Sequence, residues 1–156
     1  MKQPSDLTEF ISNIPLFGNL RREELETLSA YMDRRALKPG ETLINQWDKA
    51  ESVYFVESGA LEVLTKKGPE EYEVVATLKR GRSIGEMCLI DNFPRAATVL
   101  SKSETVVVVF AQSDFERLMS DHVELGILIL KGLARLLAQN LRKTSSRLAD
   151  NMLPMG

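Results

Sequence analysis

The middle of the sequence, from residue 32 to residue 110, consists of short runs of β-branched and aromatic residues separated by turn-forming residues. Runs of this kind are typical of the strands of a β-sandwich or barrel. The sequence therefore predicts a roll of about eight strands, with tight turns at Pro39-Gly40, Ser58-Gly59 and Lys67-Gly68-Pro69. The candidate strands cover residues 33–37, 42–45, 53–57, 61–66, 72–78, 97–101 and 105–110.

Helical periodicity replaces the strand pattern on both sides of this region. Before it, Ser5 can cap a short helix that Pro15 ends, and a second helix is predicted over residues 22–31. After it, Ser113 can cap a helix that runs to Met119, and a long helix follows over residues 123–149. The predicted fold class is therefore α+β, mainly β.

The length of the chain suits a single domain. Its 156 residues are 44% apolar and 27% charged, which supports one hydrophobic core and leaves little for a second. We expect that domain to span residues 1–150, with a helical collar at 1–31, the roll at 32–111 and C-terminal helices at 113–150. Residues 151–156 are expected to form a frayed tail.

One stretch inside the roll, residues 85–98, carries the residue types of an anion-binding pocket. Gly85 lets the backbone approach a bound group closely, and a short helical turn after it would direct free N–H groups at an anion. Arg95 supplies a planar, permanently charged fork, and Glu86 can accept hydrogen bonds from sugar hydroxyls. These residues predict a site for a nucleotide. The alternative is a surface loop in which Glu86 and Arg95 form an ordinary ion pair.

The spacing G-E-x-x-L-I-x-x-x-P-R-A-A-T in this stretch resembles the phosphate-binding cassette of cyclic nucleotide-binding domains. The resemblance implies an eight-stranded, jelly-roll-like β-roll with a short cassette helix. It implies that Glu86 holds the ribose 2′-hydroxyl and that Arg95 pairs with the phosphate oxygens. Backbone N–H groups near Cys88 and Ala96 would complete the cradle. The implied ligand-binding residues are Gly85, Glu86, Met87, Cys88, Arg95, Ala96 and Ala97.

Trp47 departs from the family pattern. The family often has a glycine there, before the aspartate matched by Asp48, whereas its other turn glycines are present here as Gly40, Gly59 and Gly81. The departure lies outside the cassette, so it concerns the shape of one loop more than the ligand.

Composition and motifs argue against several other classes of protein. The net charge is −2 and the basic pairs are scattered, so binding of nucleic acid through a basic face is not expected. The single cysteine, Cys88, and the single histidine, His122, offer neither a disulfide nor a metal site. Catalytic motifs, a signal peptide and an apolar run of the ~20 residues that a membrane helix needs are absent. We expect a cytoplasmic protein that is not an enzyme.

The long C-terminal helix carries two apolar stripes. The first, which is expected to lie on the roll, consists of Leu125, Ile129, Leu133 and Leu136. The second, here called the seam, follows a heptad pattern and consists of Val123, Ile127, Leu130, Ala134, Leu137, Leu141, Thr144 and Leu148. The seam predicts a homodimer through this helix; the alternative is that both stripes face one core.

Thr144 is the polar member of the seam. The pair Thr144-Ser145 resembles a Thr-Ser pair with which the corresponding helix of a family member touches adenine, so Thr144 is a candidate contact to the base. The alternative is that Thr144 only marks the point where the seam meets solvent.

The functional prediction is a regulatory module that binds a cyclic nucleotide and has no effector domain of its own, because the sequence ends soon after the long helix. Cyclic AMP is expected to bind better than cyclic GMP, since cyclic GMP receptors of the family tend to carry threonine or serine where this chain has Ala96. The effector would be another, unknown protein. Two alternatives stay open: an interaction module that kept the fold and lost the ligand, and a sensor of another small ligand such as a cyclic dinucleotide.

Overall fold

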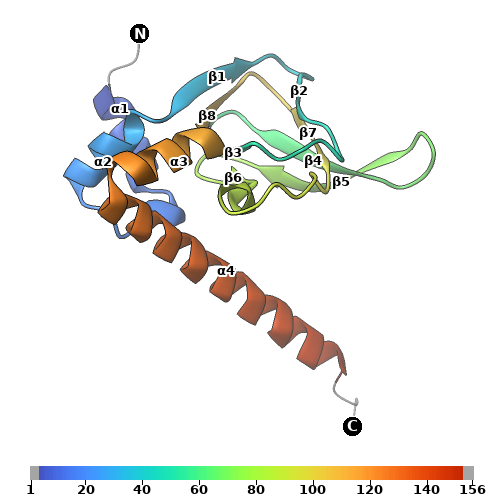
Figure 1. Cartoon of the computed structure of the whole chain (residues 1–156). Helices are drawn as coiled ribbons and strands as arrows, with labels where there is room; N and C mark the ends of the chain where they lie inside the picture. Colours follow the sequence, from blue (N-terminus) through green and yellow to red (C-terminus); the bar gives the residue numbers. More distant parts are fainter. Residues whose placement is uncertain (1–3, 153–156) are drawn as a thin grey trace.

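The computed structural model describes residues 4–152, which form two four-stranded antiparallel sheets with helices gathered at one end (Figure 1). The first sheet has the strand order β1 (Asp33–Leu37), β8 (Thr105–Ala111), β3 (Ser52–Ser58) and β6 (Ser83–Ile84). The second has the order β2 (Thr42–Ile44), β7 (Thr98–Ser101), β4 (Leu61–Lys66) and β5 (Tyr72–Leu78). The expected eight-stranded roll is confirmed.

All the predicted strands are present, with ends that differ from the prediction by at most one residue. The strand missed by the sequence is β6, whose two residues pair with Tyr54 and Phe55 of β3. Two residues are too short to show the alternation by which a strand is recognised. This short strand matters, because it leads directly into the predicted cassette.

Two apolar clusters hold the roll and the helices together. Between the sheets, buried side chains from both of them pack together: Leu37, Leu43, Ile44, Val56, Leu61, Leu78, Val99 and Val107. At the helical end, Phe55 and Phe110 of the first sheet join the second cluster with residues from every helix. The helices are α1 (Pro4–Ser12), η1 (Pro15–Phe17), α2 (Arg22–Ser29), η2 (Glu86–Leu89), α3 (Gln112–Asp121) and α4 (Val123–Met152).

Several predicted helix ends are wrong. Because α1 begins at Pro4, Ser5 lies inside the helix and not before it. The residue before α3 is Ala111, and no side chain caps that helix, so Ser113 is not its cap. The α2 helix ends at Ser29, two residues earlier than predicted, whereas α4 continues through Asn151 to Met152. The rest of the predicted tail, residues 153–156, lies outside the described residues.

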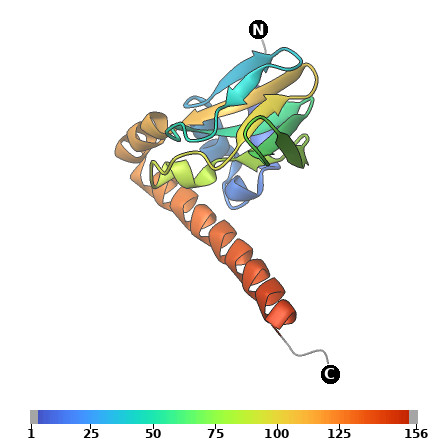
Figure 2. The same ribbon diagram turned by 90° about the vertical axis from the view of Figure 1, so that its right-hand side faces the viewer.

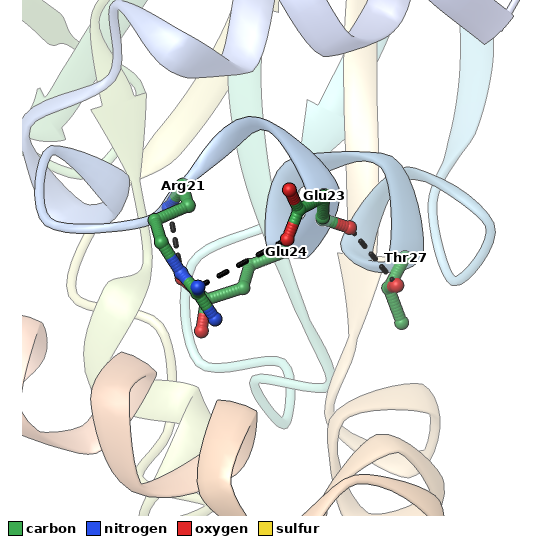
Figure 3. Close-up of polar contacts among 4 residues, drawn as sticks. All are labelled: Arg21, Glu23, Glu24 and Thr27. Carbon is green, nitrogen blue, oxygen red and sulfur yellow. Dashed lines mark hydrogen bonds and ion pairs between the residues drawn. The ribbon is translucent and has the colours of Figure 1, made fainter.

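The start of α2 is fixed by a carboxylate (Figure 3). The Arg21 amide donates to Glu24 Oε1 at 2.8 Å, and the Arg21 guanidinium Nε lies 3.4 Å from the same oxygen. One turn later the Thr27 hydroxyl donates to the Glu23 carbonyl at 3.1 Å. Negative charge in the first turn also suits the positive end of the helix dipole, so this short helix has local support beyond its packing.

The first stripe of α4 packs mainly beside other helices. Leu125, Ile129 and Leu133 are buried, and the elements that α4 contacts most are η1 and α3. A Cβ added to Gly132 would lie 2.4 Å from the Leu16 carbonyl oxygen of η1. The three buried leucine and isoleucine residues belong to the same cluster as Phe55 and Phe110 of the first sheet, so the stripe faces the core at the end of the roll, with η1 and α3 packed beside it.

The seam lies mostly in solvent. Val123, Ile127, Leu141 and Leu148 are 61%, 47%, 67% and 58% exposed, and the second half of α4 extends away from the roll in both views (Figures 1 and 2). Leu130 and Leu137 of the seam pack against the same core as the first stripe, so the alternative in which both stripes face one core holds for these two residues and is wrong for the four exposed ones. The structure contains one copy of the chain, so the homodimer stays a prediction.

Trp47 adopts the backbone conformation that favours glycine. Its φ of 76° makes it the one non-glycine residue with positive φ among residues 4–152, and its side chain is 74% exposed. The conformation is held because the Trp47 amide donates to the Arg95 carbonyl at 2.9 Å. The left-handed region costs a residue with a Cβ roughly 1–2 kcal/mol. The departure from the family pattern therefore places a residue with a Cβ in a strained backbone conformation.

This strain leads to a testable prediction. Trp47→Gly is expected to raise the free energy of unfolding by about 0.5–1 kcal/mol, because the relief of strain exceeds the extra entropy that glycine loses on folding. Urea unfolding with an unchanged m-value is the measurement. Trp47→Ala is the control: it removes the ring, keeps a Cβ at positive φ, and should give no gain. A loss of stability in Trp47→Gly would contradict the prediction.

Candidate functional site

A cavity of about 610 Å³ opens between the second sheet and the cassette. Aliphatic side chains such as Ile44, Val63 and Val99 form its walls, and three charged residues, Glu86, Asp91 and Arg95, also line it. Every ligand-binding residue predicted from the cassette lies on this cavity: Gly85, Glu86, Met87, Cys88, Arg95, Ala96 and Ala97. The fold therefore gathers residues 85–88 and 95–97 on the two sides of one space.

The cassette turn is anchored at one side and open at the other. Within η2, Cys88 and Leu89 are 2% and 4% exposed and belong to the same cluster as Phe55, while Met87 is 56% exposed. Before the turn, Gly85 has a φ of 88°. Since a residue with a Cβ rarely adopts this conformation, glycine is required for the chain to pass from β6 into the turn.

Gly85 is also required by the position of Arg95. A Cβ added to Gly85 would lie 2.1 Å from Arg95 Nη1, so the guanidinium group rests directly against the glycine backbone. On its other side, Arg95 Nη2 donates to the Ser52 carbonyl, and the guanidinium carbon lies 5.7 Å from the centre of the Tyr54 ring. These contacts leave the guanidinium half-buried beside the cavity.

The backbone of Arg95 is held as firmly as its side chain. Its amide donates to the Asp48 carbonyl at 2.8 Å, and its carbonyl accepts from the Trp47 amide at 2.9 Å. Contacts within the chain thus define the position of Arg95, which would reduce the entropy lost on binding an anion.

The side chain of Glu86 is paired with Ser83 and not with Arg95. The Ser83 hydroxyl donates to Glu86 Oε1, and the ion pairs within residues 4–152 do not include Glu86 with Arg95. The alternative of a surface loop closed by that ion pair is therefore wrong for the described chain. The partners Ser83, Ser52 and Tyr54 were not predicted, because they come from β6 and β3 and no local sequence signal connects them to the cassette.

Several backbone N–H groups at the cavity have no acceptor in the described part of the chain. They belong to Glu86 and Met87 at the start of η2 and to Ala96 and Ala97 after Arg95. The Cys88 amide, in contrast, donates to the Gly85 carbonyl at 3.0 Å. Such unpaired donors next to a guanidinium group suit an anion, because each can donate to one of its oxygens.

Cys88 is not a candidate nucleophile. Its burial raises the pKa of the thiol to about 11, an effect that the neighbouring Arg95 charge only partly opposes. At neutral pH the side chain is therefore the protonated thiol, which is a poor nucleophile. Its role is that of a small apolar residue at the base of the cassette.

Thr144 is far from the residues described above in the chain's present conformation. It lies on the exposed part of α4, where its hydroxyl donates to the Asn140 carbonyl at 3.0 Å, and it does not line the cavity. A contact between Thr144 and a base would require α4 to move or a second copy of the chain to contribute it. The contact stays a prediction.

Two further findings concern the described residues as a whole. Within residues 4–152, no three His, Cys, Asp or Glu side chains come together as a metal site. No helix in this part of the chain is long and apolar enough to cross a membrane. The cytoplasmic location stays a prediction.

Comparison with known proteins identifies the class to which this fold and cavity belong. Residues 34–122 match the family model described as "Cyclic nucleotide-binding domain", so the chain belongs to the cyclic nucleotide-binding domain family. Its sequence is similar to a cAMP-dependent protein kinase regulatory subunit from Yarrowia lipolytica, with 36% identity over 118 residues, which are 74% of this chain and 31% of that protein. The chain thus matches about a third of this relative.

Solved structures show the same fold. A cyclic nucleotide-binding domain from Methylobacillus flagellatus has a TM-score of 0.77 and 25% identity, and the match covers 97% of this chain and 85% of that one. The regulatory subunit of a cAMP-independent protein kinase A from Trypanosoma brucei has a TM-score of 0.71 and 21% identity, covering 93% of this chain and 51% of that one. Since the regulatory subunit of a cAMP-independent kinase also has this fold, the fold alone does not specify cyclic AMP as the ligand.

Proposed function

We propose that the chain binds cyclic AMP in the 610 Å³ cavity and regulates an effector. The observation that carries the proposal is the seating of Arg95 on Gly85 beside the unpaired amides of Ala96 and Ala97. A guanidinium fork with neighbouring N–H donors matches the two exocyclic oxygens of a cyclic phosphate. Glu86, on the same cavity, would accept from the ribose 2′-hydroxyl.

The base would lie against the aliphatic walls of the cavity. Val63 and Val99 of the second sheet offer apolar surface, which suits the faces of a purine ring. We propose a single domain over residues 1–150, in which α4 moves as the cassette tightens around the ligand. Such a movement requires the ligand to bind more tightly to one position of α4 than to the other.

Calorimetric titration of the purified chain with cyclic AMP tests the proposal, after removal of any nucleotide retained from expression. Saturable binding of one cyclic AMP per chain supports it. No binding of cyclic AMP or cyclic GMP would reject it in favour of an interaction module without a ligand. The remaining alternative is a sensor of another small ligand such as a cyclic dinucleotide. Mass spectrometry of the material released when the purified chain is denatured would identify such a ligand by its mass.

The residue after the cassette arginine leads to a prediction about specificity. Cyclic AMP is expected to bind about two- to tenfold more tightly than cyclic GMP, because Ala96 offers no hydroxyl to the guanine amino group and a neutral hydrogen bond contributes ~0.5–1.5 kcal/mol. Ala96→Thr should narrow this ratio in a competition titration. Ala96→Val, which has the same shape without the hydroxyl, is the control. A tenfold preference of the wild type for cyclic GMP would contradict the prediction.

The exposed seam leads to a prediction about assembly. The chain is expected to form a homodimer at tens of micromolar, because two seams can bury the apolar side chains that one copy leaves in solvent. Leu141→Lys should shift sedimentation toward the monomer. Ser146→Lys is the matched control. Ser146 lies on the opposite face of the same exposed part of α4, so this change should leave the dimer intact. A wild-type monomer at these concentrations would reject the seam as an interface.

A further inference from the structure

The segment that joins the cassette turn to Arg95 has no regular structure of its own. Residues 91–93 belong to no helix or strand, yet Asp91 and Phe93 line the cavity. This segment sets the separation between Glu86 at one end of the cassette and Arg95 at the other. Its local hydrogen bonds join neighbours in sequence: Asp91 N to the Met87 carbonyl at 3.0 Å and Phe93 N to Asp91 Oδ1 at 3.3 Å.

Asn92 ties this segment to the rest of the domain. Its Nδ2 donates to the Ala50 carbonyl at 3.2 Å and to Gln112 Oε1 at 2.5 Å. Ala50 is buried, lies just before β3 and forms part of the cavity wall. One side-chain amide therefore joins the loop between η2 and Arg95 to the opposite wall of the cavity.

Gln112 completes the connection from the other side. It is the first residue of α3, and its backbone amide donates to the Glu51 carbonyl at 2.9 Å. Its side-chain Nε2 faces the Asp91 carbonyl at 3.5 Å, while its Oε1 accepts from Asn92. The glutamine is therefore held by the start of β3 and contacts two successive residues of the cassette segment.

We infer that Asn92 and Gln112 form a clamp that positions the cassette for its ligand, an inference that rests on the proposed function. Neither side chain lines the cavity, so both are positioning residues that act through the segment 91–93 and Arg95. Without the clamp, the segment gains conformations in which Arg95 and Glu86 are no longer at the separation that one ligand spans. Binding then has to restore the order, and affinity falls.

The clamp is tested by cyclic AMP titration of Asn92→Ala, Gln112→Met and the double variant, at a temperature well below the lowest melting temperature of the set. Each single variant is expected to bind about tenfold more weakly, which is the effect of losing a pair of side-chain hydrogen bonds that are partly open to water. The double variant is expected to lose clearly less than the hundredfold that independent effects would give, because the hydrogen bond between Asn92 and Gln112 is lost in both single variants. Ser113→Ala, next to Gln112 and without a side-chain hydrogen bond in the described chain, is the matched control.

A rescue variant separates positioning from general stability. Asn92→Asp removes the donor to both Ala50 and Gln112 and should bind weakly, whereas Asn92→Asp combined with Gln112→Lys restores a donor–acceptor pair across the clamp and should regain part of the affinity. If Gln112→Met does not fold, Gln112→Glu decides instead: it keeps the acceptor for Asn92, loses the donor to Asp91, and should bind about threefold more weakly.

The outcomes distinguish the clamp from the function on which it rests. A wild type that binds cyclic AMP, with both single variants within twofold of it, overturns the clamp and leaves the proposed function standing. A hundredfold, additive loss in the double variant also overturns it, since the two residues would then act independently. A wild type that does not bind cyclic AMP overturns both.

Discussion

Arg95→Lys is expected to weaken the binding of cyclic AMP by about one and a half to nearly four decades. Truncating one member of a buried charge pair costs ~2–5 kcal/mol, at ~1.4 kcal/mol per decade. The structure explains why lysine is a poor substitute. Three contacts place the guanidinium group: the Gly85 backbone, a hydrogen bond to the Ser52 carbonyl and the Tyr54 ring. An ammonium group is a point charge that cannot make these contacts and bind two phosphate oxygens together.

Calorimetry with cyclic AMP measures this effect, and two variants act as controls. Arg82→Lys changes an exposed arginine that does not line the cavity and should leave the affinity unchanged. Glu86→Gln should cost less than Arg95→Lys, because an amide oxygen still accepts a hydrogen bond from the ribose hydroxyl and from Ser83. A change of less than threefold in Arg95→Lys would remove Arg95 from the binding site, and a larger loss in Glu86→Gln would reverse the ranking.

Glu57→Leu is expected to lower the free energy of unfolding by about 3 kcal/mol, because it removes a buried carboxylate that accepts two hydrogen bonds from the Arg34 guanidinium group. The Glu57 side chain is 7% exposed and accepts from Arg34 Nε at 2.7 Å and from Nη2 at 3.0 Å. This cost is at the low end of the range for breaking a buried ion pair, since the Arg34 side chain is still 20% exposed to solvent. For a domain of this size the loss corresponds to roughly 6–12 °C in Tm.

Urea unfolding and thermal melting measure this loss, with a surface pair as the control. Glu26 pairs with Arg22 on α2 with side chains 57% and 74% exposed, so Glu26→Gln should change stability by no more than about 0.5 kcal/mol. Replacing both members, Arg34→Met with Glu57→Leu, should recover most of the loss, because no charge is then left buried. A cost of less than 1 kcal/mol for Glu57→Leu would show that water or another group compensates Arg34, against the prediction.

The strands and the cassette were determined by the sequence itself. Alternating β-branched runs that end in turn residues predict strand positions closely, since both signals are local and each run has to bury one face. The chemistry of Gly85, Glu86 and Arg95 is also local, because backbone freedom, an acceptor and a planar cation are properties of the residues. The structure adds that all of them reach one cavity.

What surrounds the cassette was decided by the tertiary structure alone. Ser52 and Tyr54 hold Arg95 because β3 pairs with β6 and so lies beside the cassette, which brings Ser52 against a guanidinium group 43 positions later in the sequence. Trp47 takes a positive φ because its amide is bonded to the Arg95 carbonyl, a constraint that no neighbour in sequence imposes. The two stripes of α4 look alike in the sequence, and only the position of the collar decides that one is buried and the other faces solvent. The physical reason is the same in each case: periodicity and residue chemistry are encoded locally, whereas the partner of a side chain depends on which distant segment the fold brings against it.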